Sequence, residues 1–228
     1  MERYTYFFGD GRAEGLQLGK MLLGGKGANL TEMDHLGIPV PPGLTITTAA
    51  CNYYSQHQTF PAGLEEQLKE KLSTLETTLQ RKFGGSPPLL VSVRSGAPVS
   101  MPGMMDTILN LGLNQQTLQG LIESTGNERF AWDSYRRFIQ MFSDVVLDLA
   151  HHDFEHLLEK RKAAAGVEQD TGLGVAELKI LVEDYKALVR ERTGSDFPED
   201  VQVQLRKAIE AVFRSWNNER AIFYRKIN

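Results

Sequence analysis

Two segments of this 228-residue chain carry residue types that bind phosphate. The first, residues 22–30, reads LLGGKGANL, so that glycines surround Lys26 immediately before an expected helix. Backbone N–H groups and an ammonium group in such a segment can approach a phosphate closely. It is not a Walker A loop, because Lys26 is followed by Gly27 rather than by Ser or Thr. The alternative interpretation is a glycine-rich turn with a solvated lysine.

The second segment, residues 92–106, reads SVRSGAPVSMPGMMD. An expected strand ends at Arg94, and a loop of small residues, prolines and methionines follows. A guanidinium can donate two hydrogen bonds to one phosphate, and methionine side chains offer a soft apolar surface to a flat ring. A loop of this length and composition is more typical of a binding function than of a plain connection, although a strand connection with a surface arginine is the alternative.

Two aromatic segments, residues 130–142 and 213–225, have their rings at helical spacing. This spacing predicts that the rings pack in the core and that the arginines among them lie at the surface. Arg136 and Arg137 are expected to be solvated or paired with acids; the alternative is that one of them faces a ligand cleft.

The remaining candidates for metal binding or nucleophilic chemistry are weak. His152 and His156 have the i,i+4 spacing of a metal-binding pair, but no third ligand is evident, so no metal site is predicted in this chain. Cys51 has no identifiable base nearby in the sequence and is expected to be a small buried side chain.

The elements that must position these residues change in character along the chain. Most of the 21 glycines and eight of the nine prolines lie in the first 112 residues, which mix short strands with helices. Thr47 or Thr48 is expected to cap a helix that ends near His57, and Gly37 to end an earlier one. The expected strands are residues 4–8, 44–47, 89–94 and 107–111, and the expected helices are 27–36, 48–57 and 64–83.

From Asn114 onward the pattern is almost wholly helical. Ala131, Tyr135, Phe138, Phe142, Val145 and Leu149 recur at steps of three and four, which predicts one apolar helical face. Further helices are expected at 153–165, at 175–192 and from Pro198, which suits a first helical turn.

Composition excludes several classes of protein. With 25 basic and 29 acidic residues the net charge is −4, which argues against a nucleic-acid or membrane-surface protein. A single cysteine excludes an internal disulfide framework and a multi-cysteine zinc site. No apolar run has membrane-spanning length and no signal peptide is evident, so the expected location is cytoplasmic.

Taken together, five segments resemble the N-terminal nucleotide-binding region of the pyruvate, phosphate dikinase family. The resemblance covers essentially the whole chain, and its most specific part is the run at 89–114, whose MPGMMDT stretch is absent from the more loosely similar phosphoenolpyruvate synthases. The segments are LLGGKGANLTEM (22–33), IPVPPGLTITTAAC (38–51), LLVSVRSGAPVSMPGMMDTILNLGLN (89–114), RFAWDSYRRFIQMFSDVV (129–146) and VFRSWNNERAIFYR (212–225).

This resemblance implies an α+β chain: an ATP-grasp-type nucleotide-binding lobe, here incomplete, with a helical subdomain. It implies that Lys26 and Arg94 contact ATP phosphates as the catalytic contacts, and that the loop at 95–106 closes over the nucleotide. The nucleotide-binding residues implied are Gly24, Gly25, Lys26, Gly27, Arg94, Ser95, Gly96, Ser100, Met101, Gly103 and Asp106.

In the family, ATP and phosphate react with a histidine and release AMP and pyrophosphate, and the phosphohistidine then transfers its phosphoryl group to pyruvate to give phosphoenolpyruvate. The second half of the ATP-grasp domain with its Mg²⁺ ligands, the histidine domain and the pyruvate domain are expected beyond this chain. The chain alone is therefore expected to be inactive, and the parent enzyme to be a homo-oligomer. The expected divisions are an α/β lobe at 1–112, a helical subdomain at 113–195 and a returning helix at 196–228.

Two alternatives remain open at this stage. The chain could be a non-catalytic binding or regulatory module derived from a dikinase. It could also be a segment of a related enzyme of the phosphoenolpyruvate synthase type, because the phosphoryl acceptor is chosen by domains that this chain lacks.

Overall fold

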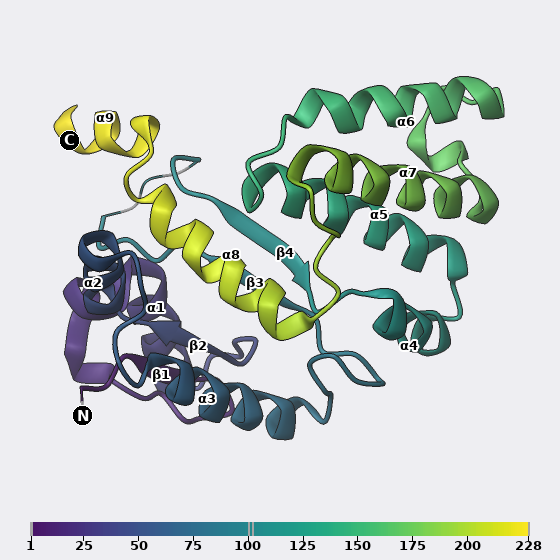
Figure 1. The fold of residues 1–228 in the computed structure, drawn as a ribbon. Helices are drawn as coiled ribbons and strands as arrows, with labels where there is room; N and C mark the ends of the chain where they lie inside the picture. Colours follow the sequence, from purple (N-terminus) through teal and green to yellow (C-terminus); the bar gives the residue numbers. More distant parts are fainter. Residues whose placement is uncertain (1, 100, 102, 228) are drawn as a thin grey trace. The chain divides into compact units, whose positions relative to one another are not determined.

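A computed structural model describes residues 2–99, 101 and 103–227, and it divides the chain into two compact units (Figure 1). Unit 1 comprises residues 1–81, 94–107 and 212–228, and unit 2 comprises 82–93 and 108–211. The protein is α+β and mostly helical, and its described strands form two small sheets of two strands each.

Three elements cross the boundary between the units, and the others belong to one unit. The crossing elements are β3 (Val91–Arg94), β4 (Thr107–Leu111) and α8 (Val201–Ser215). Unit 1 also contains β1 (Thr5–Phe8), the 3-10 helix η1 (Leu16–Leu18), α1 (Gly19–His35), β2 (Gly43–Ile46), α2 (Thr48–His57), α3 (Leu64–Leu79) and α9 (Glu219–Ile227). Unit 2 also contains α4 (Gln115–Thr125), α5 (Glu128–Val145), α6 (His151–Ala165), the 3-10 helix η2 (Asp170–Gly172) and α7 (Val175–Thr193).

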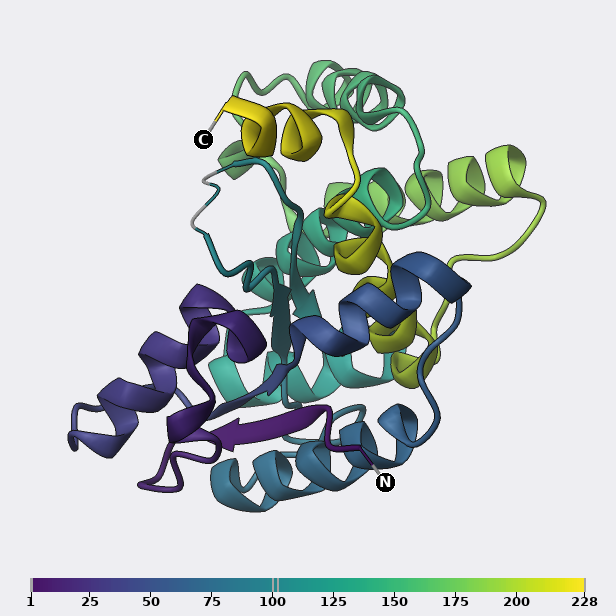
Figure 2. The ribbon, with the colours of Figure 1, turned by 90° about the vertical axis from the view of Figure 1, so that its left-hand side faces the viewer.

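Unit 1 is organised around the antiparallel pair of β1 and β2, in which Thr5 pairs with Ile46 and Phe8 with Gly43. Helices α1 and α3 each contact both strands, and α2 contacts α1 (Figure 2). Phe7 of β1 is 1% exposed and Leu64 of α3 is fully buried, so the apolar face of this pair forms part of the core of the unit.

The loop after β1 is held by one buried carboxylate at the end of α1. Asp34, 6% exposed, accepts hydrogen bonds from the backbone N–H groups of Gly9 (2.8 Å), Gly11 (3.0 Å) and Ala13 (2.9 Å). Burial by itself raises the pKa of this carboxyl, but these N–H donors outweigh burial and hold its pKa below the usual range. The charged form of Asp34 therefore stabilises the turn that connects β1 to η1.

Unit 2 is a helical unit in which α5 contacts α4, α6 and α7. The predicted apolar face of α5 is confirmed for its first four members, since Ala131, Tyr135, Phe138 and Phe142 are all fully buried. Phe197 packs edge-on against Phe138 and Phe142 with ring centroids 5.9 and 5.4 Å away. The helix ends at Val145, so Leu149 lies beyond it.

A partly exposed carboxylate in unit 2, Glu199 in the segment before α8, joins several elements although its side chain is 42% exposed. Glu199 Oε1 accepts a hydrogen bond from the Tyr135 hydroxyl (2.8 Å) and pairs with the Lys186 ammonium (2.7 Å), while its Oε2 accepts from the Gln115 N–H (3.0 Å). Burial raises the pKa of Glu199, but these partners outweigh burial and lower it overall. Glu199 thus connects α4, α5 and α7 to the start of α8.

Several expected helix ends differ from the structure. The expected cap at Thr47 is confirmed, because its side chain accepts a hydrogen bond from the Ala50 N–H at 3.4 Å. The helix expected to continue to Phe83 ends at Leu79, because Gln80 adopts a left-handed backbone conformation with φ 51°. None of the described helices is both long and apolar enough to cross a membrane.

Pro198 does not lie in the first turn of the last long helix, so that expectation is wrong. Helix α8 begins at Val201, where Asp200 Oδ1 accepts hydrogen bonds from the N–H groups of Gln202 (2.8 Å) and Val203 (3.2 Å). An aspartate in the N-cap position satisfies helix N–H groups that lack backbone partners, and it sets the start of the helix three residues after the proline.

Candidate functional site

The glycine-rich segment lies inside α1, at a kink. Helical residues flank Gly24 on both sides, but Gly24 itself has φ 70° and ψ 167°. This conformation is essentially restricted to glycine, because a Cβ atom would clash with the local backbone. Gly25, Lys26 and Gly27 therefore form the first turn of the helical segment after the kink, rather than a turn before the helix as expected from sequence.

The kink lies directly against the segment that follows β3. The Gly25 N–H donates a hydrogen bond to the Ala97 carbonyl oxygen at 2.8 Å. A Cβ atom added to Gly24 would lie 1.2 Å from the carbonyl oxygen of Gly96, so the two backbones touch where a side chain would stand. The structure thus brings together, within unit 1, the two segments that the sequence singled out for phosphate chemistry.

A third glycine sets the packing of the same turn on the sheet. A Cβ atom on Gly27 would lie 2.7 Å from both the hydroxyl oxygen and the methyl carbon of Thr45 in β2. Gly27 is buried, and it lets α1 approach β2 more closely than any larger residue would allow. The glycines of this segment therefore serve close backbone packing on two sides.

The two cations of the site are exposed. Lys26 is the second residue after the kink, and Arg94 is the last residue of β3, two residues before Gly96. Within the described part of the chain, the side chains of Lys26 and Arg94 make no hydrogen bond or ion pair. Both charges are available to an anion from solution without first breaking an ion pair.

The predicted loop residues after Arg94 are placed as follows. Ser95 and Gly96 are half-buried, as are Met101 and Asp106, while Gly103 is exposed with φ 71°. The Met104 N–H donates to the Met101 carbonyl at 3.2 Å, which forms a turn within the loop. Ser100, also predicted to bind nucleotide, lies outside the described residues.

Sequence reasoning missed two polar residues that contact this loop. The Asp106 N–H donates to the Ser215 hydroxyl at 3.3 Å, and the Asn218 side-chain amide donates to the Met104 carbonyl at 2.9 Å. Both residues lie in the segment at 213–225, whose aromatic spacing predicted only core packing. The dipeptide Asn217-Asn218 between two helices was the available signal, since asparagine is favoured at helix starts.

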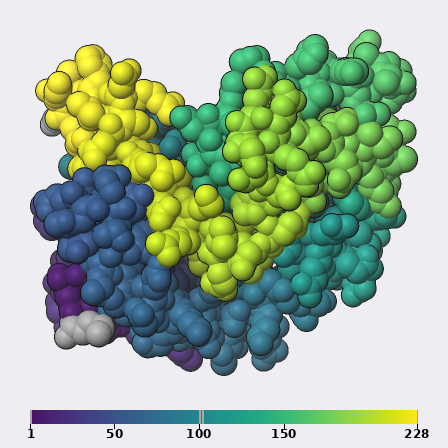
Figure 3. All heavy atoms as spheres, viewed as in Figure 1, coloured from purple at the N-terminus to yellow at the C-terminus, as the bar shows by residue number. Residues whose placement is uncertain are grey.

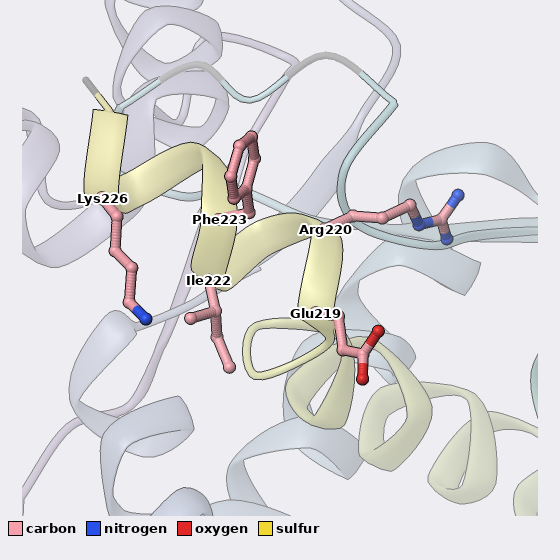
Figure 4. Close-up of a pocket in the computed structure, with 5 residues that line it drawn as sticks. All are labelled: Glu219, Arg220, Ile222, Phe223 and Lys226. Carbon is pink, nitrogen blue, oxygen red and sulfur yellow. The ribbon is translucent and has the colours of Figure 1, made fainter.

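The prediction for aromatic residues at 213–225 is wrong for one member. Phe213 is buried, but Phe223 is 65% exposed. Phe223 and Ile222 extend to different sides of α9, as Figure 4 shows. They line an open hollow of about 490 Å³ together with Glu219, Arg220 and Lys226, and neither Lys26 nor Arg94 lines it. This hollow is therefore separate from the candidate phosphate site.

The other sequence candidates lie away from this chemistry. Arg136 is 3% exposed and pairs with Asp133 at 2.6 Å and with Asp170 at 3.3 Å, so it is a structural cation of unit 2. The exposed Arg137 also pairs with Asp133. Cys51 is half-buried rather than buried, and burial raises the pKa of its thiol to about 11.

Metal ligands are not assembled in the part of the chain that the structure describes. Among residues 2–99, 101 and 103–227, no three or more His, Cys, Asp or Glu side chains form a group that could hold a metal ion. The described residues therefore do not fit a complete Mg²⁺ site by themselves. What the arrangement offers is two exposed cations next to a backbone turn in which glycines replace side chains.

Comparison with known proteins gives a consistent match along the chain. A family described as "Pyruvate phosphate dikinase, AMP/ATP-binding domain" matches residues 20–76 and 56–228. The chain is 54% identical over 230 residues to a pyruvate, phosphate dikinase of Rhizobium meliloti, and 49% identical over 231 residues to one of Clostridium symbiosum. It is 52% identical over 229 residues to the chloroplastic pyruvate, phosphate dikinase 1 of Arabidopsis thaliana.

These matches cover the whole of this chain but only part of each relative. The matched part is 26% of the Rhizobium and Clostridium proteins and 24% of the Arabidopsis protein. The chain thus spans about a quarter of the length of the curated relatives that it matches.

Proposed function

Because the chain belongs to the pyruvate phosphate dikinase AMP/ATP-binding domain family, we propose that unit 1 binds the phosphates of ATP. Lys26 and Arg94 are the cationic contacts, and the backbone N–H groups of Lys26 and Gly27 are further donors. The observation that carries this proposal is the direct contact between the Gly24–Gly25 kink and the Gly96–Ala97 backbone, which sets two cation-bearing segments next to each other.

The physical argument rests on charge and access. A polyphosphate carries several negative charges, and an exposed ammonium and guanidinium stabilise them without losing an existing ion pair. The Gly25 N–H already donates to Ala97, so the backbone donors that we assign to a phosphate are those of Lys26 and Gly27, which gain from the partial positive charge at the start of a helical segment. The proposed set of contacts is completed by residues of the loop at 95–106, namely Ser95, Gly96, Ser100, Met101, Gly103 and Asp106.

At the level of the parent enzyme, we assign the chain to the ATP-dependent half of the dikinase reaction. There ATP and phosphate phosphorylate a histidine on another domain, and pyruvate becomes phosphoenolpyruvate at a third. The lobe at residues 1–112 is of the ATP-grasp type, a helical subdomain follows at 113–195, and the helix at 196–228 returns to the lobe. Chain segments beyond these 228 residues supply the Mg²⁺ ligands and much of the adenine pocket, and without them the chain does not catalyse the reaction. A cytoplasmic location and a homo-oligomeric parent enzyme belong to the same proposal.

Titration of the chain with ATP, followed by calorimetry and by amide chemical shifts, tests the proposal. Lys26→Ala and Arg94→Ala each remove one charged hydrogen-bonding partner, which weakens binding by roughly 10- to 100-fold. Lys20→Ala is the matched control, because Lys20 is an exposed lysine of α1 that precedes the kink. Equal ATP affinity in all three variants contradicts the assignment of Lys26 and Arg94.

Magnesium dependence tests the second part of the proposal. The chain alone is expected to bind ATP weakly and with little effect of Mg²⁺, because its described residues assemble no metal site. Tight, magnesium-dependent binding by these 228 residues would refute the idea that they form only part of the ATP site.

A further inference from the structure

The loop that carries the proposed nucleotide contacts is held at both of its ends within unit 1. At its start, the Ala97 carbonyl accepts the N–H of Gly25. At its far end, Met104 and Asp106 bind side chains at the junction between α8 and α9. Residues 103–106 therefore depend for their position on a part of the chain more than a hundred residues away in sequence.

The junction is itself a fixed support. Ser215, 3% exposed, donates its hydroxyl proton to the Val212 carbonyl at 2.7 Å while it accepts from Asp106. Phe213, on the last turn of α8, packs against Tyr54 and Phe60 with ring centroids 5.5 and 6.1 Å away. In the space-filling view, the yellow end of α8 lies directly against the blue α2 segment (Figure 3). An anchor on this junction is thus tied to the core of unit 1.

Asn218 uses both ends of its side-chain amide. Its Oδ1 accepts the N–H of Ala221 at 2.7 Å and caps the start of α9, while its Nδ2 donates to the Met104 carbonyl at 2.9 Å. A carboxylate at this position could replace the cap but not the donor, because ionised carboxylates only accept hydrogen bonds. The two roles of Asn218 can therefore be separated by one conservative substitution.

The nearby ion pair is a weaker connection. Arg220 Nη2 lies 3.8 Å from Asp106 Oδ1, and the arginine side chain is 66% exposed. Figure 4 shows Arg220 extending away from Ile222 and Lys226 on α9. An exposed pair at this separation contributes little, so the hydrogen bonds of Asn218 and Ser215 are the principal anchors.

We propose that Asn218 is a positioning residue for the nucleotide loop: its amide fixes the Met104–Asp106 end of the loop to the start of α9, so that movement of α9 changes the position of the loop. Only the expected effect of this anchor on nucleotide binding rests on the proposed function. The anchoring itself holds whether or not the chain binds ATP.

Asn218→Asp tests the anchor, with Asn217→Asp as the matched control. Both variants add one negative charge at the junction, and aspartate caps helices as well as asparagine does, so both should fold with similar thermal stability. Asn217 is exposed and its side chain has no partner among the described residues. Only Asn218→Asp removes the donor to Met104 and sets a carboxylate against that carbonyl.

The first measurement is amide hydrogen exchange of residues 103–107 in the chain without nucleotide. We expect exchange in Asn218→Asp to be roughly 5- to 10-fold faster than in Asn217→Asp, which corresponds to the loss of one hydrogen bond. Equal exchange in the two variants overturns the anchor.

The second measurement is titration of the wild-type chain and both variants with ATP, followed by amide chemical shifts. Weaker ATP binding by Asn218→Asp than by Asn217→Asp supports the positioning role. Faster exchange with unchanged ATP affinity overturns the link to the nucleotide and leaves Asn218 as a structural anchor. If the wild-type chain shows no shift at millimolar ATP, the proposed function fails, while the exchange result still decides the anchor.

Discussion

Replacing Gly24 by alanine introduces the most severe small perturbation that the candidate site offers. The new Cβ atom lies 1.2 Å from the carbonyl oxygen of Gly96, which is backbone and cannot rotate away. The variant must either separate the kink of α1 from the segment after β3 or distort both. In either case the hydrogen bond from the Gly25 N–H to Ala97 is weakened or lost.

The magnitude follows from two contributions. A non-glycine residue with the φ and ψ of Gly24 costs about 1–3 kcal/mol in backbone strain. Overpacking of a closely fitted contact costs about 1–3 kcal/mol more. Their sum, about 2–6 kcal/mol, is a large fraction of the stability of an ordinary domain. We therefore expect Gly24→Ala to be strongly destabilised.

Gly19→Ala separates the two contributions. Gly19 has nearly the same backbone conformation, with φ 66° and ψ −179°, but a Cβ atom added there has nothing within 4 Å. It should therefore show the backbone strain without the clash. The free energies of unfolding of both variants can be measured by urea denaturation, with amide exchange of Gly25 as the local reporter.

We expect the free energy of unfolding of Gly24→Ala to lie about 1–3 kcal/mol below that of Gly19→Ala. ATP affinity should fall in Gly24→Ala and stay close to wild type in Gly19→Ala, because only the first disturbs the contact between the two cation-bearing segments. Equal destabilisation of the two variants, with a protected Gly25 amide in both, would refute the close contact on which the site is built.

Three further predictions concern single side chains. Asp34→Asn should lower the free energy of unfolding by about 2 kcal/mol, because an amide cannot accept as well from three N–H groups. Since the pKa of Asp34 is lowered in the folded chain, its contribution is present above about pH 4 and is lost as the pH falls through the folded-state pKa. If the stability of the variant depends on acid pH in the same way as that of the wild type, this role of Asp34 is refuted. Glu199→Gln should destabilise unit 2 by about 1 kcal/mol in urea through the loss of its charge pair with Lys186, because solvent screens a carboxylate that is 42% exposed, and an unchanged midpoint would argue that the pair contributes nothing to stability. Cys51, with its thiol pKa raised to about 11, should react with iodoacetamide at pH 8 about two orders of magnitude more slowly than an unperturbed thiol, and a rate like that of free cysteine would be inconsistent with its burial.

Local patterns predicted the elements of this protein well. The apolar residues of α5 recur with the helical period, so they must share one face, and the first four are fully buried. The strand at Thr5–Phe8 and the cap at Thr47 follow in the same way from propensity and from side-chain hydrogen bonding. These features depend on residues within a few positions of each other, which is the range over which sequence periodicity acts.

The ends of elements were less predictable. Gln80 ends α3 four residues before the pair of glycines that was expected to stop it, and Asp200 rather than Pro198 determines where α8 begins. Phe223 fits the spacing of a core residue yet lies exposed on α9. In each case the apolar spacing was compatible with more than one outcome, and the backbone of Gln80 and the cap at Asp200 are features that this spacing does not record.

The sequence by itself singled out the candidate phosphate contacts: Lys26 among glycines, and Arg94 before a loop of small residues. Only the tertiary structure decided that Gly24 and Gly96 touch, and that Asn218 holds the far end of the same loop. Such contacts join segments that are distant in sequence, and they depend on the path of the chain through unit 1. A local pattern records what each segment can form, whereas the partner of a backbone N–H or carbonyl is set by the packing of the whole unit.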